Sequence, residues 1–437
     1  MLERFVRNAL PACLVGVLVA CDGGKPRKHD AGVAVRPVPT VTTAPSVASA
    51  RVPDAATGES ADAAAGQIED AGRAVASGDA GGPTSACRIA YGPAELPFWG
   101  AASLVMSASE LRVVTNDGGK PRVHAVPVTA PPPPGAPPVS PPRALSFEAM
   151  RGPPCEVAGK WAFCPGPGGL VQRSELGGTA TKTVAKSRPG TRVAASLVGA
   201  TGEHAVVAYL DTRKTSEGDT VQAFVAIDEQ EPVRLSEDGA GATSVRLVAR
   251  SGNVVAVYMD ARSAMLPLHA RPLTLLGDKL SLGTDAVVFI GGPPERGVDF
   301  TLAGAGRSLF ALVPMPKETA TFGVAAVPIE DPPKDDVSAV WSTYPNGLDP
   351  APIAATTRLG EGGPVWVARV RPKEAPPASP RVLELGKLDG AGRFTALGTV
   401  AEGRSVVHVA IAADTFGALW LVYGDRSGSW LERLVCP

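Results

Sequence analysis

From Cys87 to the end of the chain, short apolar runs alternate with clusters of turn-forming residues. The runs are rich in Val, Ala and Leu, and they show no helical periodicity. Short apolar runs bounded by Gly, Pro, Asn and Asp are typical of β-strands. Runs 110–114 and 123–128 flank the turn sequence Asn116-Asp117-Gly118-Gly119, which predicts a hairpin. The region is therefore predicted to be all-β.

The strongest of these runs recur at a nearly constant interval. Their centres lie in steps of 48 to 56 residues, near Val113, Trp161, Tyr209, Tyr258, Ala311, Val367 and Leu421. A period near 50 is typical of four-stranded propeller blades, and the 351 residues from 87 to 437 give about 50 for each of seven blades. We therefore predict a seven-bladed β-propeller, with six or eight blades as alternatives. The rival fold is a tandem of two β-sandwich domains divided near residues 328–336.

Residues 1–20 have the pattern of an export signal. Arg4 and Arg7 precede an apolar stretch, residues 9–20, which is shorter than the roughly 20 residues of a membrane-spanning helix. The stretch ends in Leu18-Val19-Ala20-Cys21, which resembles the bacterial lipobox. The resemblance implies a signal peptide followed by a lipoprotein whose Cys21 carries fatty acids such as palmitate. It also implies a membrane-anchored protein of the cell envelope, at the inner or outer membrane and on the periplasmic or surface side.

The segment between the signal and the β-rich region has a different character. Residues 21–86 consist largely of Ala, Asp, Gly, Pro, Ser, Thr and Val, with almost no large side chains. Such a composition does not bury enough apolar surface to offset the entropy of the chain. We predict a disordered linker, which as a flexible coil of about 65 residues has an r.m.s. span of roughly 45 Å. The predicted organisation is thus signal, residues 1–20; lipidated cysteine and linker, 21–86; and propeller, 87–437.

The cysteines fit an exported protein. Cys13 leaves with the signal, and four cysteines remain besides Cys21. An even number in an oxidising compartment favours disulfides, and four cysteines allow three pairings. We favour Cys155–Cys164, which closes a short local loop, and Cys87–Cys436, which joins the two ends of the folded region. No spacing typical of zinc ligands competes with this interpretation.

Composition and motifs exclude several function classes. The net charge is −1 and only 19% of the residues are charged, so no basic field indicates nucleic acid. The sequence holds no metalloprotease, nucleophile-elbow, Walker or dinucleotide-binding motif. We expect no metal and no cofactor. The five histidines are scattered without ligand spacing.

One polar feature is repeated. Tyr209-Leu210-Asp211-Thr212-Arg213 and Tyr258-Met259-Asp260-Ala261-Arg262 share a Tyr-x-Asp-x-Arg core 49 residues apart, and residues 423–426 form a degenerate third copy. On a strand, the Tyr, Asp and Arg of one copy point to the same face. The functional interpretation is a ring of carboxylates and guanidinium groups that faces a ligand. The structural interpretation, which repetition favours, is a strand-end turn whose Asp accepts backbone N–H groups and whose Arg pairs between blades.

The charged ring weakly resembles sialidase-like propellers. The resemblance is limited, because the Ser-x-Asp-x-Gly-x-Thr-Trp boxes of those proteins are absent and their arginine triad is not identifiable. Glycoside hydrolysis needs two carboxylates a set distance apart. The carboxylates considered for this role are Glu203, Asp211, Asp260, Asp299 and Asp425.

The leading hypothesis is an envelope lipoprotein whose propeller binds a protein or glycan partner without catalysis. The alternatives are a carbohydrate-active hydrolase or lyase on the same scaffold, and a structural envelope component without a small ligand. A cluster of unlike charges at the central mouth would favour an enzyme, and a broad apolar patch would favour a protein partner. Fold alone does not decide between them.

Overall fold

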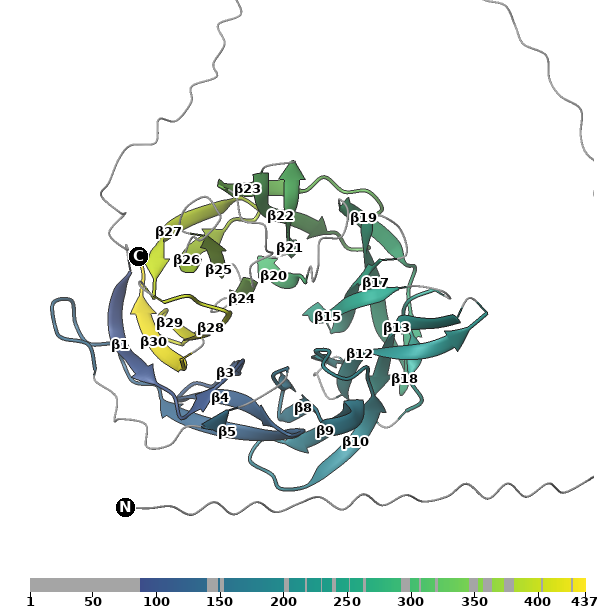
Figure 1. Cartoon of the computed structure of the whole chain (residues 1–437), viewed down its shortest axis with the longest axis horizontal. Helices are drawn as coiled ribbons and strands as arrows, with labels where there is room; N and C mark the ends of the chain where they lie inside the picture. Colours follow the sequence, from purple (N-terminus) through teal and green to yellow (C-terminus); the bar gives the residue numbers. More distant parts are fainter. Residues whose placement is uncertain are drawn as a thin grey trace, which may run out of the picture. The chain divides into compact units, whose positions relative to one another are not determined.

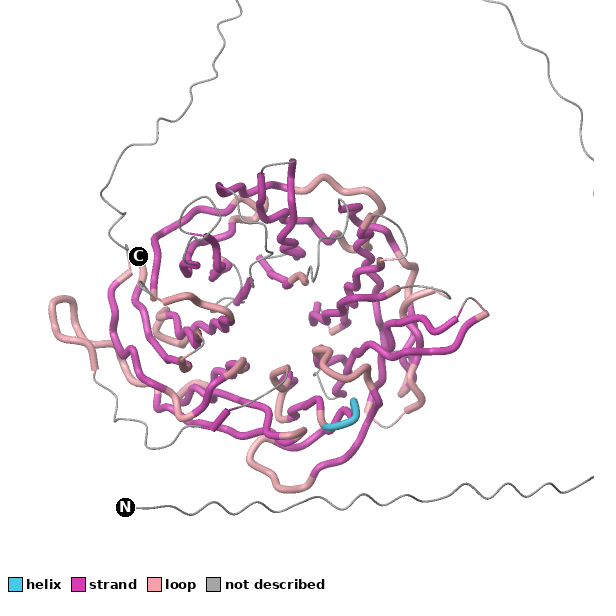
Figure 2. The backbone as a smooth tube through the Cα atoms, viewed as in Figure 1, coloured by secondary structure: helices cyan, strands magenta, loops and turns pink. Residues whose placement is uncertain are grey.

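The computed structural model describes a ring of seven β-sheets (Figures 1 and 2). The described residues are 87–437 without 140–147, 150–152, 200–203, 217, 229, 238–240, 251, 262–264, 292–298, 306–307, 319–320, 346–352, 357–363, 373–380, 402–403 and 426. Within them there is no α-helix, and one short 3₁₀ turn spans Pro167–Gly169. The prediction of an all-β, seven-bladed propeller is confirmed. The predicted signal, the lipidation site Cys21 and the linker lie outside the described residues.

Each blade is an antiparallel sheet that runs outward from the centre of the ring. The strands of each blade are given from the innermost outward. Blade 1 contains β3 (Ser103–Met106), β4 (Glu110–Asp117) and β5 (Lys120–Pro127), and blade 2 contains β7 (Glu156–Ala158), β8 (Trp161–Pro165), β9 (Leu170–Glu175) and β10 (Thr181–Lys186). Blade 3 contains β11 (Ala194–Val198), β12 (His204–Thr215), β13 (Gly218–Ile227) and β14 (Val233–Arg234), and blade 4 contains β15 (Ala242–Arg250), β16 (Asn253–Asp260) and β17 (Leu266–Leu276), with β18 (Lys279–Leu282) and β19 (Ala286–Gly291) both paired to β17.

Blades 5 to 7 follow the same order. Blade 5 contains β20 (Thr301–Ala305), β21 (Ser308–Glu318), β22 (Thr321–Ile329) and β23 (Val340–Pro345). Blade 6 contains β24 (Ile353–Thr356), β25 (Val365–Pro372), β26 (Arg381–Leu388) and β27 (Phe394–Val400). Blade 7 contains β28 (His408–Ala413), β29 (Leu419–Gly424), β30 (Ser429–Val435) and β1 (Arg88–Glu95). A short parallel pair, β2 (Phe98–Trp99) with β6 (Glu148–Ala149), lies outside the blades.

The periodic apolar runs of the sequence are the second strands of the seven blades, namely β4, β8, β12, β16, β21, β25 and β29. These strands are apolar on both faces because each face packs on a different neighbouring blade. In β16, Val255 and Val257 pack toward blade 5, whereas Val254 and Tyr258 pack toward blade 3. This two-sided burial explains why the runs are continuous and do not alternate with polar residues.

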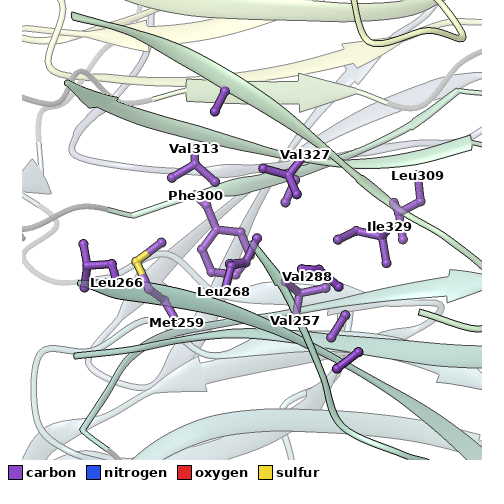
Figure 3. Packing of buried hydrophobic residues seen from close by; sticks show 14 of the residues in the cluster. Val257, Met259, Leu266, Leu268, Val288, Phe300, Leu309, Val313, Val327 and Ile329 are labelled. Atoms are coloured by element: carbon purple, nitrogen blue, oxygen red, sulfur yellow. The ribbon is translucent and has the colours of Figure 1, made fainter. Parts of the chain in front are cut away.

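Seven hydrophobic clusters fill the seven interfaces between adjacent blades. The cluster between blades 4 and 5 is shown in Figure 3, where Leu268 and Val257 of blade 4 face Val313 and Val327 of blade 5 around the ring of Phe300. One cluster per interface means that no blade has an apolar face without a partner. The core is therefore distributed around the ring.

The ring closes in blade 7, where the N-terminal strand β1 pairs antiparallel with β30 near the C-terminus. Cys87 and Cys436 form a disulfide at this junction, and Cys155 and Cys164 form the second one. Both favoured pairings are thus present. The blade contains the two ends of the folded region, which fits the large sequence separation of 349 residues across the first disulfide.

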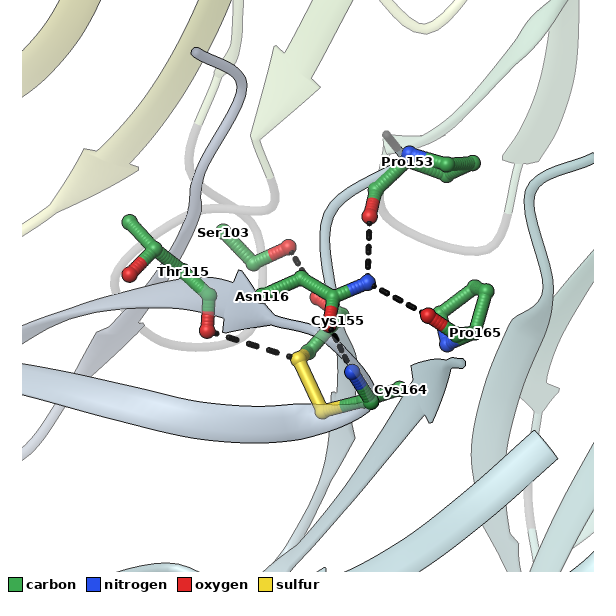
Figure 4. The surroundings of a disulfide bond; sticks show 8 residues. Ser103, Thr115, Asn116, Pro153, Cys155, Cys164 and Pro165 are labelled. Atoms are coloured by element: carbon green, nitrogen blue, oxygen red, sulfur yellow. Dashed lines mark hydrogen bonds between the residues drawn. A yellow bond between two sulfur atoms is a disulfide. The ribbon is translucent and has the colours of Figure 1, made fainter. Parts of the chain in front are cut away.

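The second disulfide lies between blades 1 and 2 (Figure 4). Cys155 precedes β7 and its carbonyl accepts a hydrogen bond from Ser103 Oγ at 2.6 Å. Asn116, at the end of β4, donates through Nδ2 to the carbonyls of Pro153 and Pro165 at 2.9 and 2.8 Å. The disulfide is formed within blade 2, and the hydrogen bonds of Ser103 and Asn116 attach this part of blade 2 to blade 1. Asn116 belongs to the hairpin that the sequence predicts, which is the β4–β5 pair.

Blade 1 has three strands in the described part of the chain, and the proline-rich segment that follows it takes another path. The sequence predicts that this segment is extended and does not enter a sheet. Ala136 N–H donates to the Pro133 carbonyl at 3.1 Å in a turn, and Val139 forms an isolated bridge with Tyr91 of β1. Val139 N–H donates to the Ala90 carbonyl at 3.1 Å. Residues 131–138 form no strand, as predicted, and the single bridge forms at Val139 because this residue retains the backbone donor that its proline neighbours lack.

The strand order gives the propeller two distinct faces. A four-stranded antiparallel blade ends at the face where it began, so the chain enters every innermost strand from the same side. We call this side the front face: it carries the starts of the innermost strands and the ends of the second strands. The rear face carries the opposite ends. Cys87 and Cys436 lie on the rear face, because β30 runs parallel to β28 and ends there.

Candidate functional site

The repeated tyrosines of the sequence are part of the core. Tyr209, Tyr258 and Tyr423 are each 1% exposed, and each packs toward the preceding blade. Each ring also stacks on a ring of the next strand of its own blade. The partners and the distances between ring centroids are Phe224 at 5.9 Å for Tyr209, His269 at 4.7 Å for Tyr258 and Trp430 at 6.1 Å for Tyr423. None of the three reaches the surface to contact a ligand.

Burial also affects the ionisation of these tyrosines. It raises the pKa of Tyr209 to about 12, with a smaller contribution from the charge of Asp211. It raises the pKa of Tyr258 as well, and there the hydroxyl donates a hydrogen bond to Asp285 Oδ2 at 2.6 Å. Both hydroxyls therefore stay protonated at neutral pH.

The charged residues of the repeats pair locally. Arg213 Nε lies 2.9 Å from Asp211 Oδ2, and the guanidinium lies 4.9 Å from the centre of the Phe224 ring. Asp260 is buried, and its Oδ1 accepts the Gly241 N–H at 2.9 Å. Arg262 lies outside the described residues. The two copies occupy separate blades, 3 and 4, and these contacts do not bring them around one ligand.

A different group of charges gathers toward the front face, just before or within the innermost strands of blades 2 to 5. We call it the mouth cluster; its members are Glu156, Arg192, Ser244, Arg246 and Asp299. Arg192 donates to Glu156 Oε1 at 3.1 Å and joins blade 2 to the segment that enters blade 3. Arg246 of β15 pairs with Asp299, which lies just before β20. The cluster thus extends over four consecutive blades.

Asp299 is held in a fixed orientation. Its Oδ1 accepts hydrogen bonds from Ser244 Oγ at 2.5 Å and from the Phe300 N–H at 2.8 Å, and its Oδ2 pairs with Arg246. The side chain of Arg246 is only 13% exposed, whereas that of Asp299 is 45% exposed. A buried guanidinium therefore supports an aspartate side chain that is partly exposed.

The two ion pairs interact with each other electrostatically. Burial by itself would raise the pKa of Asp299, but the charges of Arg246 and Arg192 lower it below its usual value. Burial lowers the pKa of Arg246, and the charge of Arg192 adds to this effect. Asp299 is therefore ionised at neutral pH. The charge of Arg192 thus affects the pKa of both members of the neighbouring pair.

Sequence reasoning named one member of this cluster, Asp299, among five candidate carboxylates. Of the other four, Glu203 lies outside the described residues, Asp211 and Asp260 have the local contacts described above, and Asp425 lies in blade 7 with Oδ2 3.9 Å from Arg404. Glu156, Arg192, Ser244 and Arg246 were missed. The one available signal was their position just ahead of, or early in, an innermost strand, and those strands are short and weakly patterned.

His408, at the start of β28, should make the free energy of unfolding depend on pH. Burial lowers its pKa from 6.5 to about 4 in the folded state. The unfolded chain therefore binds a proton more readily between these values, so stability is full above about pH 6.5 and falls as the pH drops to about 4. The loss amounts to about 3 kcal/mol, since one pKa unit corresponds to about 1.4 kcal/mol. Urea denaturation across this range should show the decline.

A His408→Gln variant provides the control for this prediction. Glutamine has no titrating group, so the difference in unfolding free energy between pH 7 and pH 4 should shrink by most of that amount. An unchanged pH dependence in the variant would assign the decline to other groups.

Two further searches of the described residues gave negative results. No group of three or more His, Cys, Asp and Glu side chains is placed to hold a metal ion there. No helix in that part of the chain has the length and apolar character needed to cross a membrane.

No family model matches the sequence, and no curated protein matches it either. Several solved structures are similar at low identity. A soluble aldose sugar dehydrogenase from Escherichia coli is 10% identical, with 65% of this chain and 96% of that chain covered and a TM-score of 0.38. A Trypanosoma rangeli sialidase in complex with sialic acid is 12% identical, with 78% and 54% covered and a TM-score of 0.37.

A neuraminidase-like protein of subtype N11 from A/flat-faced bat/Peru/033/2010 (H18N11) is also similar. It is 12% identical, with 79% of this chain and 89% of that chain covered and a TM-score of 0.36. The chain spans about half the length of the sialidase. The proteins similar to this chain thus include sialidase-like structures, and no family is defined by them. The functional argument therefore rests on the residues of the mouth cluster.

Proposed function

We propose that this protein is an envelope lipoprotein whose propeller binds a glycan at the mouth cluster without catalysis. The observation that supports the proposal is that Asp299 and Arg192 are partly exposed and held in place by other residues. Their side chains are 45% and 46% exposed, while their partners fix them in place. Pre-oriented groups of this kind bind a ligand with little further loss of conformational freedom.

The chemistry of the two exposed groups suits a sugar. An ionised carboxylate only accepts hydrogen bonds, and a guanidinium only donates them. A sugar hydroxyl does both, so neighbouring hydroxyls of one ring can donate to Asp299 and accept from Arg192. Hydrogen bonds to charged groups are among the stronger ones, with a net value of about 1.5–3 kcal/mol each. Two such contacts support specific binding.

The enzyme alternative has one observation in its favour, since a cluster of unlike charges does lie at the front face. Glycoside hydrolysis by an acid and a base also needs a carboxyl group that keeps its proton near neutral pH. The pKa of Asp299 is lowered, so it is a poor proton donor. Burial raises the pKa of Glu432, but this side chain is in the core and bonded to the Tyr423 hydroxyl at 3.2 Å. These properties favour binding over catalysis.

The membrane anchor is a separate part of the proposal, and it rests on the lipobox sequence before Cys21. The two disulfides support an oxidising compartment outside the cytoplasm. Labelling of cells with a fatty-acid analogue should mark the protein, and Cys21→Ser should abolish the label. A label that persists in this variant would contradict lipidation at Cys21.

The binding proposal predicts that oligosaccharides raise the melting temperature of the protein in a dose-dependent way, because a ligand stabilises the state that it binds. Asp299→Asn and Arg192→Gln should each weaken binding by about tenfold, which corresponds to about 1.4 kcal/mol. A panel of neutral, acidic and amino-sugar oligosaccharides would be screened by thermal shift, and hits would be measured by calorimetry.

The matched control is Asp389→Asn. Asp389 also pairs with an arginine, Arg393, at 2.9 Å, but it lies in the turn between β26 and β27 on the rear face. This variant should bind as the unaltered protein does. Equal losses in all three variants, or no shift with any sugar, would contradict a glycan site at the mouth cluster.

A further inference from the structure

A groove toward the rear face lies between the outer strands of blades 3 and 4, where β13 and β18 are neighbours (Figure 1). We call it the rear groove. Its volume is about 500 Å³, within the range of roughly 300–1,000 Å³ that is usual for ligand sites. Four apolar side chains line it, all from the cluster between these blades: Val225, Ile227, Val233 and Leu280. The last two are only partly buried, so the groove presents an apolar wall to a ligand.

The rim of the rear groove is polar and carries more negative than positive charge. Its residues are Gln230, Glu231, Asp278 and Lys279. Gln230 Nε2 donates to the Asp278 carbonyl and thereby links the two turns that form the rim. The two acids and the lysine are exposed, and no ion pair holds any of them among the described residues. Two carboxylates and one ammonium group are thus available to a ligand.

The neighbouring charges do not reverse the sign of the rim. Asp228 is already bound, with its carboxylate oxygens 2.8 Å from His204 Nδ1 and 3.6 Å from Arg173. Arg234 is not among the lining residues, because successive side chains of β14 point to opposite faces. Glu229 lies outside the described residues and is itself acidic. An apolar wall with an acidic rim is complementary to an apolar ligand that carries a positive charge.

The outer edge of β18, beside the rear groove, has unpaired backbone groups. β17 and β18 are joined by a two-residue turn, and in such a hairpin hydrogen-bonded and non-bonded pairs alternate from the turn onward. Gly283 N–H donates to the Pro272 carbonyl at 2.8 Å, as this alternation requires. The N–H and C=O groups of Leu280 and Leu282 therefore point away from β17. No described residue forms a hydrogen bond with them.

We propose that the rear groove binds an extended peptide segment of a partner protein, which joins blade 4 as a further strand beside β18. The backbone of the segment would pair with that of Leu280 and Leu282, as in other cases of strand addition. Every second side chain of the segment then points toward blade 3. A large aliphatic residue reaches the apolar wall, and a Lys or Arg two or four residues away reaches Glu231 and Asp278. This surface does not depend on glycan binding at the mouth cluster, which lies toward the front face.

The two features together favour a peptide over other ligands. An unpaired strand edge is matched by another extended backbone, whereas a sugar or a fatty acid does not repeat its spacing of donors and acceptors. The outermost strands of other blades also have such an edge. The groove and its unpaired acids distinguish β18 from them.

The test uses the full chain and a displayed library of random octapeptides. Selected peptides are resynthesised with a fluorophore, and their dissociation constants are measured by fluorescence polarisation. We expect them to place a Lys or Arg two or four positions from a Val, Ile or Leu. Their affinity should fall between about 50 mM and about 500 mM NaCl, because the rim charges are exposed to screening.

Reversal of the rim charges tests where the peptides bind. The double variant Glu231→Lys, Asp278→Lys should weaken binding by at least about tenfold, because like charges that face each other are unfavourable. The matched control is Glu95→Lys, Asp219→Lys, which reverses two other exposed acids without ion-pair partners among the described residues and should bind as the unaltered protein does. Melting curves without peptide would confirm that both variants fold.

Methylation of the peptide backbone tests strand addition without altering the protein. Only every second N–H of an added strand faces β18. N-methyl groups at one set of alternate positions should therefore abolish binding, and those at the other set should leave it largely unchanged.

Equal losses for the two methylation patterns, or for the two double variants, would overturn the proposal, as would a library that yields no binder. If Asp299→Asn removes peptide binding, the peptides occupy the mouth cluster and the rear groove is not their site. A dimer of the chain that sedimentation detects, and that the rim variant dissociates, would assign the groove to a second copy and overturn a partner peptide. Glycan binding should be the same in the rim variant and the unaltered protein, so failure of one proposal leaves the other intact.

Discussion

Asp414→Ala should lower the free energy of unfolding by about 3–5 kcal/mol, which is typical when one partner of a buried ion pair is removed. Asp414 is fully buried, and it pairs with Arg433, whose side chain is 4% exposed. Its Oδ2 also accepts the indole N–H of Trp420 at 3.0 Å, and its Oδ1 accepts the N–H groups of Phe416 and Ala418 at 2.9 and 3.0 Å. The substitution leaves all of these groups without their acceptor.

The effect should extend beyond blade 7, because Arg433 also donates to the Thr129 carbonyl at 2.7 Å, just after blade 1. The loss is measured by urea denaturation, with the slope of the unfolding free energy against urea concentration held equal for both proteins. The matched control is Asp389→Ala, since Asp389 accepts two backbone N–H groups and pairs with an arginine in the same manner but on the surface. Its loss should be much smaller, because water and salt screen an exposed pair. Similar losses in both variants would show that burial of the pair does not determine its importance.

Removal of the Cys87–Cys436 disulfide should cost about 6 kcal/mol in the chain-entropy description of crosslinks. The bond spans 349 residues, so it closes nearly the whole propeller into one loop. It also holds β1, which is the outer strand of blade 7 and is separated by almost the full chain from its partner β30. We expect the paired Cys87→Ala and Cys436→Ala substitutions to lower the melting temperature. They should also speed hydrogen exchange first in β1.

The second disulfide offers the comparison. Cys155 and Cys164 are 9 residues apart, and the same description gives a cost of about 3 kcal/mol for their removal. The paired alanine variant should therefore be the more stable of the two, and hydrogen exchange in β1 should stay slow. A larger loss for the short loop than for the long one would show that local packing outweighs loop closure in this protein.

The sequence predicts the fold well because the same pattern of burial recurs in each of the seven blades. Each second strand must bury both faces, so runs such as the one around Tyr258 stand out against their surroundings. Their interval gives the size of a blade, and the terminal cysteines indicate where the ring closes. The bridge formed by the proline-rich segment was not predicted. It depends on Val139, a single residue whose backbone N–H donates to the Ala90 carbonyl of β1.

The site was less accessible from the sequence. The repeated Tyr-x-Asp-x-Arg copies drew attention because they are regular, yet Tyr209 and Tyr258 pack in the core. The mouth cluster has no repeat, because each blade contributes a different residue type at a similar place. Arg192 and Asp299 are distant in the sequence, yet the charge of Arg192 lowers the pKa of Asp299. Such a set becomes visible only when the position of every innermost strand is known.

The closure of blade 7 has a practical consequence for anyone who handles this protein. Because Cys87 and Cys436 are bonded to each other on the rear face, both ends of the propeller lie together on the side opposite the mouth cluster. A tag, a fluorophore or a fused partner joined directly to either end of the propeller is thus attached on the rear face. The same proximity makes the protein suited to circular permutation: a short peptide can connect the old ends, and new ends can be opened in a surface turn between blades.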